Sequence, residues 1–128
     1  MVNEVNIIKK PEYLLAVVVA NSSCLEEGIR HFQDILSACS EFERQKVLLD
    51  FHLTNDDMSL IDEVMYIKRI AQEYQRYLDA GNPPLKIAFW GSPDRIKPHS
   101  PSPKIGKEIG LNMFVTDNEA AAIAWLIG

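Results

Sequence analysis

Three predominantly apolar runs constrain the fold of this chain more than any other feature. They cover residues 13–20, 47–51 and 85–90, and each is rich in Val, Ile, Leu, Phe or Ala. Runs of this kind, without polar alternation, are typical of strands that are covered on both faces of a sheet. Amphipathic helical patterns separate the runs, so the sequence predicts an α/β domain with a mostly parallel or mixed sheet and right-handed crossovers.

The helices that separate these strands have recognisable ends. Gly81 is positioned for a C-cap of the second helix, and Pro83 prevents its continuation. Asp57 is an alternative start for that helix. Three sites fit a capping box, in which Ser or Thr precedes an acidic residue by three positions: Ser23–Glu26, Ser59–Asp62 and Thr116–Glu119. The apolar face predicted for the second helix comprises Ile61, Val64, Ala71, Tyr74 and Leu78.

The two ends of the chain complete the predicted topology. Residues 3–8 form a weak first strand, which can pair with 13–20 only as a local hairpin and so adds an antiparallel edge. Ser102–Pro103 opens a short helix, 113–115 forms a last strand, and 120–127 forms a final helix. No repeat or linker is evident. We therefore expect one domain over 1–128, with a mixed sheet of four to five strands that combines a first antiparallel hairpin with parallel βαβ units.

Composition excludes several classes of function. A net charge of −5 and a pI of about 5.1 argue against general nucleic-acid binding, and no apolar stretch is long enough to span a membrane. The segment from Lys9 to Ala20 imitates a secretory signal, but Pro11 and Glu12 interrupt it, which favours a buried strand. Cys24 and Cys39 lie on one predicted helix, roughly 22 Å apart, too far for a disulfide. Reduced thiols fit a cytoplasmic protein.

With these elements the chain resembles the SpoIIAA-like (STAS/SEC14-type) superfamily, in particular its small stand-alone bacterial members. The resemblance rests on the element order, on the strand 47–50 before a long helix, and on the tail 114–126, which reads FVTDNEAAAIAWL. It implies a sheet of four or five strands with helices mainly on one face. It also implies a non-enzymatic, regulatory role through protein–protein interaction, like that of anti-sigma-factor antagonists.

Those antagonists carry a phosphorylated serine at the start of the helix after the central strand, in an Asp-Ser-Ser-Gly motif. The closest positional match here is Ser59, but the paired serines and the glycine are absent. As a phosphoacceptor, Ser59 would place negative charge at a helix N-terminus. As a cap, it would satisfy free backbone N–H groups. We favour the cap, because Asp56, Asp57 and Asp62 would repel a phosphate.

A protein-interaction surface is predicted where the chain leaves the sheet. The segments 54–62 and 91–97 follow strands that we expect to be adjacent, so they should share one edge. The candidate interaction residues are Thr54, Asp56, Asp57, Ser59, Asp62, Gly91 and Ser92. Their partner is an unidentified protein. A homodimer is also plausible, because an edge strand and an apolar helix face could pair.

The alternative function is a binding module for a small molecule or a lipid headgroup, which uses the basic loop 92–107. This stretch is the only locally basic one in an acidic chain, and it includes the predicted helix start at Ser102–Pro103. The candidate anion-binding residues are Arg95, Lys97, His99 and Lys104.

No catalytic set, cofactor motif or metal-ligand spacing is recognisable. Asp50 ends the central strand, and Asp56, Asp57 and Asp62 could join it as oxygen ligands of Mg²⁺ or Ca²⁺, as in a metal-dependent hydrolase. The favoured interpretation is that Asp50 accepts backbone hydrogen bonds in a turn. The histidines His31, His52 and His99 are scattered, and no serine lies in a nucleophile elbow. We therefore predict no enzyme activity, no cofactor and no metal.

Overall fold

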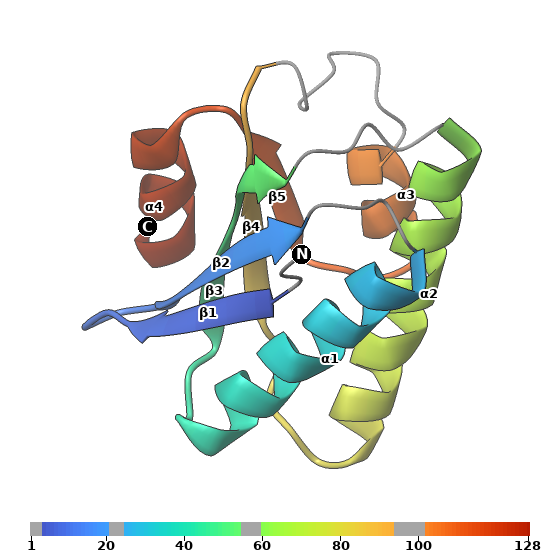
Figure 1. Cartoon of the computed structure of the whole chain (residues 1–128). Coiled ribbons are helices and arrows are strands. Elements are labelled where there is room, and N and C mark those ends of the chain that lie inside the picture. Colours follow the sequence, from blue (N-terminus) through green and yellow to red (C-terminus); the bar gives the residue numbers. More distant parts are fainter. Residues whose placement is uncertain (1–3, 21–24, 55–59, 94–101) are drawn as a thin grey trace.

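The computed structural model describes residues 4–20, 25–54, 60–93 and 102–128 (Figure 1). Within these ranges the chain forms five strands and four helices. Their order is β1 (Glu4–Lys9), β2 (Leu14–Ala20), α1 (Leu25–Glu41), β3 (Lys46–Thr54), α2 (Leu60–Asp79), β4 (Lys86–Trp90), α3 (Ser102–Glu108), β5 (Met113–Thr116) and α4 (Glu119–Ile127). No helix in these ranges is both long and apolar enough to cross a membrane.

The strands lie in the sheet in their sequence order, β1-β2-β3-β4-β5. The pair β1–β2 is antiparallel, and the pairs from β2 to β5 are parallel. This topology confirms the predicted antiparallel hairpin followed by parallel βαβ units. A sequential order with right-handed crossovers places all three crossover helices on the same face of the sheet. Accordingly, α1, α2 and α3 lie on one face, whereas α4, which is no crossover, lies on the other (Figure 1).

The main hydrophobic core lies between the sheet and the crossover helices. Val47 and Leu49 of β3 point into it, together with Phe32 of α1 and Ile70 of α2, and all four are almost completely inaccessible to solvent. Gly106 allows α3 to approach β5 closely, because a Cβ at this position would collide with the sulfur of Met113. The predominantly apolar strands therefore have one face that the crossover helices cover.

A smaller cluster lies on the opposite face, under α4. Leu48 and Ala88 of the sheet contact Ala122 and Leu126 of α4, and all four are buried. The ring of Trp125 stacks on Phe114, with centroids 5.5 Å apart. The small residues of α4 allow this close approach. Trp125 is half-buried, at the edge of the cluster.

The ends of three elements differ from the sequence-based expectation. We expected β3 to end near Asp50, but it continues to Thr54 because its ladder with β2 persists across a register shift. We expected Thr116 to cap the last helix. Instead Asn118 is the N-cap, and its Oδ1 accepts a hydrogen bond from the Ala121 N–H at 2.9 Å. Thr116 does not cap the helix itself but supports the capping residue, because its Oγ1 accepts a hydrogen bond from the N–H of Asn118.

The start of α2 differs as well. Ile61 was expected on the apolar face of this helix, but it is 73% exposed. At the other end of α2 the prediction holds. Gly81 has a φ of +97°, its N–H donates to the carbonyl of Leu78, and the N–H of Asn82 donates to that of Tyr77. This is a Schellman C-cap, which needs the left-handed conformation that glycine adopts without strain.

Candidate functional site

The predicted interaction surface lies at the carboxyl edge of the parallel strands. The structure confirms that β3 and β4 are neighbours, with Asp50 opposite Trp90 in the ladder. Of the predicted residues, Thr54, Asp62, Gly91 and Ser92 lie within the described ranges. Asp56, Asp57 and Ser59 lie outside them, as does the proposed capping box of Ser59.

The described residues of this surface lie at different distances along the strands and differ in exposure. Thr54 pairs with Ala20 of β2, four residues beyond the Asp50–Trp90 pair where β4 ends. Gly91 is buried, and its N–H donates to the carbonyl of Thr116 at 3.2 Å. Gly91 therefore continues the ladder with β5 rather than offering a contact to solvent. Ser92 is half-buried next to it.

Asp62 lies exposed in the first turn of α2. A carboxylate at this place is favoured by the free N–H groups and the positive end of the helix dipole. Its exposure is compatible with the predicted contact to a partner.

Sequence reasoning missed an exposed apolar pair at the start of α2. Ile61 is 73% exposed, and Met65, one turn later, is 47% exposed. Over residues 61–79 of this helix, the buried residues are Ile67, Ile70, Tyr74 and Tyr77. Ile61 precedes Ile67 by six positions, or about 240° around the helix axis, so it points away from the core. That offset was a readable signal, because Ile67 and Ile70 define the buried stripe better than Ile61 does.

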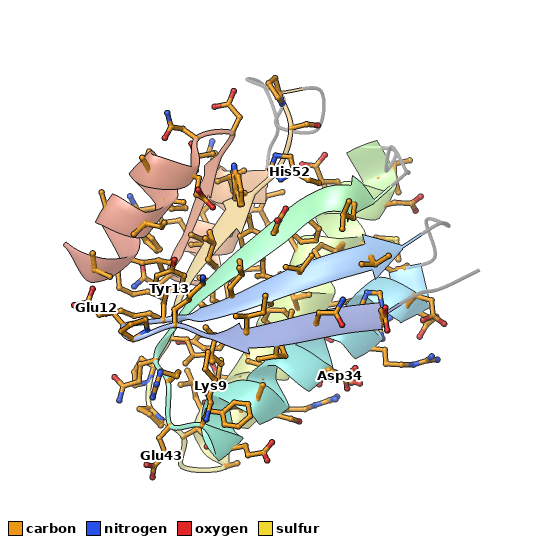
Figure 2. The ribbon with its side chains drawn as sticks, turned by 60° about the vertical axis from the view of Figure 1, so that its left-hand side comes forward. Lys9, Glu12, Tyr13, Asp34, Glu43 and His52 are labelled. Carbon is orange, nitrogen blue, oxygen red and sulfur yellow. The ribbon has the colours of Figure 1, made fainter. Side chains whose placement is uncertain are left out.

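A second group at the carboxyl edge comprises Asp50, His52 and Trp90. Asp50 Oδ1 lies 2.6 Å from His52 Nδ1 and also accepts a hydrogen bond from the His52 backbone N–H at 2.9 Å. The carboxylate only accepts, so Nδ1 carries the proton in the neutral ring. The imidazole also meets Trp90 edge-on, with centroids 4.4 Å apart. Figure 2 shows His52 at the end of the sheet where β3 and β4 finish.

This arrangement orients an imidazole beside an aromatic ring. The interpretation of Asp50 as a hydrogen-bond acceptor is confirmed, although inside β3 rather than in a turn. Among the described residues, no three His, Cys, Asp or Glu side chains lie close enough to share a metal ion. What remains is an oriented polar group beside an aromatic ring, a combination that suits contact with a partner.

The other titratable side chains of interest lie inside the fold. His31 is buried on α1, and its Nε2 has no hydrogen-bond partner. Burial lowers the pKa of His31, and the carboxylates of Glu27 and Asp34 offset part of that shift. Cys39 is a buried free thiol whose pKa is raised to about 12 by burial, so it stays protonated. Cys24 lies outside the described residues.

Only one of the predicted anion-binding residues lies where the structure describes the chain. Lys104 is exposed on α3, a helix that begins at Ser102 as predicted. Arg95, Lys97 and His99 lie outside the described residues. The anion-binding loop therefore remains a prediction from the sequence.

Comparison with known proteins places the fold. No family model matches the chain, and no curated protein matches it in sequence. Among solved structures it is similar to a serine-to-glutamate variant of RsbS from Moorella thermoacetica, with 16% identity and a TM-score of 0.56. That match covers 96% of this chain and 94% of the other. It is also similar to an anti-sigma factor antagonist from Mycobacterium paratuberculosis, with 8% identity, a TM-score of 0.58, and coverage of 98% and 94%. The SpoIIAA-like architecture that the sequence resemblance implied is therefore confirmed.

Proposed function

We propose that this chain is a non-enzymatic regulatory domain that acts by binding another protein, as anti-sigma-factor antagonists do. The fold supports this proposal, because it matches a solved antagonist over nearly the full length of both chains. We also propose that the chain is located in the cytoplasm, because Cys39 is a free thiol and reduced thiols are typical of that compartment.

The observation that carries the proposal is the exposed apolar pair Ile61 and Met65. Most exposed positions of a helix are polar, whereas these two form an apolar spot at the start of α2 with Asp62 beside it and the exposed Lys68 one turn on. Large apolar side chains ringed by charges are typical of contact sites, because they gain free energy when a partner removes them from water. The apolar pair also adjoins the segment that precedes α2, where the sequence predicts the interaction surface.

The acidic residues near this pair suggest the chemistry of the partner. Asp62 is exposed, and the sequence places Asp56 and Asp57 just before the helix. A partner surface with apolar anchors and a basic rim would complement both features. Ser59 and Ser92 belong to the same proposed surface, and the buried Gly91 between Ser92 and the end of β4 supports it through its backbone bond to Thr116. We propose that Ser59 acts as a cap there and not as a phosphoacceptor.

Affinity capture tests this proposal with a matched pair of variants. The tagged chain is expressed in its native host, and captured proteins are identified by mass spectrometry. Ile61→Ser should abolish recovery of a specific partner, and Asp62→Lys should weaken it. Ile127→Ser is the control, because Ile127 is also an exposed helical isoleucine, at 42%, but lies on α4 across the sheet. Recovery that is unchanged by Ile61→Ser, or reduced equally by Ile127→Ser, would contradict the assignment.

A further inference from the structure

Strand β1 presents an unprotected edge. It is the outermost strand of the sheet, and within the described residues no segment pairs with its outer side. Natural edge strands are protected by proline, bulges or central charges. Here the ladder with β2 is regular through all six residues, and β1 contains no proline. Its charged residues, Glu4 and Lys9, stand only at the two ends. The edge is therefore open to pairing with another strand.

The hairpin shows which backbone groups face this edge. The N–H of Lys10 donates to the carbonyl of Tyr13 at 2.9 Å, so these opposite residues form a hydrogen-bonded pair. Hydrogen-bonded and non-hydrogen-bonded pairs alternate along an antiparallel ladder. Counting back from Lys10, the even-numbered residues of β1 bond to β2. The N–H and C=O groups of Val5, Ile7 and Lys9 therefore point outward, away from β2.

We propose that β1 pairs antiparallel with β1 of a second copy of this chain, about a two-fold axis at Ile7. In this register Ile7 faces Ile7 of the second copy, and Val5 faces Lys9. Each such pair exchanges two backbone hydrogen bonds, which gives roughly six across the interface. The two sheets then join into one continuous sheet, and the symmetric contact closes after two copies.

Charge complementarity favours a second copy as the occupant of this edge. In the proposed register Glu4 of one copy lies opposite Lys10 of the other, and the two-fold axis creates this pair twice. Opposite charges placed directly across a ladder are stabilising. A register shifted by one pair would set Glu4 against the apolar Ile8, which is 44% exposed. A parallel arrangement would set Glu4 beside Glu4, so the antiparallel pairing centred on Ile7 satisfies both the charges and the hydrogen bonds.

The face of β1 and β2 that no helix covers leaves room for this contact. Figure 2 shows β1 and β2 from that side, with α4 beyond β3 and α1 behind the sheet. Glu4, Asn6 and Ile8 face this open side, whereas Val5 and Ile7 pack toward the main core. The proposed dimer contact lies apart from the start of α2, so it does not depend on the proposed function.

Sedimentation equilibrium of the purified full chain tests the dimer. The wild type should show a concentration-dependent monomer–dimer equilibrium. Ile7→Pro should raise the dimer dissociation constant by more than about tenfold, because it removes the outward N–H at the two-fold axis. Asn6→Ala is the control, since it alters the same strand without removing an outward donor. Circular dichroism checks that each variant is folded.

A charge swap provides a second test that does not touch the core. Glu4→Lys alone and Lys10→Glu alone should each weaken the dimer about three- to tenfold, because each places like charges in opposition. The double variant Glu4→Lys/Lys10→Glu should restore the wild-type dissociation constant. A monomer at all concentrations would overturn the proposal. A dimer whose dissociation constant is unchanged by Ile7→Pro and by the charge swaps would also overturn it, because that dimer would use another surface.

Discussion

The two faces of the sheet differ in how much of each is covered. On one face α1, α2 and α3 bury the side chains of the strands in a single large core. On the other face α4 packs on β3, β4 and β5, and only the start of β2 reaches its cluster. Beyond α4, Val17 and Val19 are half-buried, and Leu53 is 57% exposed.

This difference shows that an apolar strand is not always a covered strand. Residues of β2 on both faces are apolar, yet Leu14 and Ala16 are buried whereas Val17 and Val19 are not. The register shift in β3 adds Leu53 to the same open area, opposite Val19. The uncovered half-sheet lies next to the free edge of β1 and borders the proposed dimer contact.

The largest predicted effect contrasts the two cores. Phe32 is completely buried in the main core, and Phe32→Ala should lower the free energy of unfolding by about 3–5 kcal/mol. Leu126 is equally buried under α4, but Leu126→Ala should cost about 2–3 kcal/mol, because the terminal helix can move toward the cavity. Urea unfolding of both variants measures the difference. An equal or larger loss in Leu126→Ala would show that the face under α4 is as rigid as the other.

A smaller effect concerns the start of α4, which holds the half-covered face together. Asn118→Ala removes the side-chain oxygen that accepts from the Ala121 N–H, and should lower the free energy of unfolding by about 1 kcal/mol. Asp117→Ala is the matched control, because Asp117 is exposed and adjacent but does not occupy the cap position. If both variants lose the same stability, the assignment of Asn118 as N-cap is wrong.

The covered face also contains a titratable group whose effect depends on pH. Burial lowers the pKa of His31 in the folded chain, so the unfolded chain binds more protons between that pKa and the usual value of about 6.5. Stability should therefore fall as pH decreases through this interval. His31→Gln should reduce that dependence, and urea midpoints between pH 5 and 8 measure it. An unchanged pH profile in the variant would refute the assignment.

The smallest predicted effect lies on the open half of the sheet. Leu53→Ala should change the free energy of unfolding by less than about 0.5 kcal/mol, because the side chain is already mostly in water. Leu49→Ala, on the same strand but buried in the main core, should cost about 2–5 kcal/mol. If Leu53→Ala proves costly in dilute solution, this area is covered in the folded protein.

Much of the candidate site could be predicted from the sequence, but the exposure and contacts of its side chains could not. The adjacency of the segments after β3 and β4 followed from the alternation of strands and helices. The exposure of Ile61 was missed although its offset from Ile67 and Ile70 signals it. The capping role of Asn118 was missed because Thr116 serves equally well on local pattern alone. The contact of His52 with Trp90 joins two strands, and no local pattern encodes it.

The sequence by itself determined the order of strands and helices, the first hairpin and the C-cap at Gly81. These depend on hydrophobic periodicity and backbone preference, which are properties of short segments. Only the tertiary structure decided which apolar residues are covered. Three right-handed crossovers place α1, α2 and α3 on the same face, and the short α4 is left to cover the other. That imbalance leaves one face of β1 and β2 only partly covered, because coverage depends on how many helices reach each face.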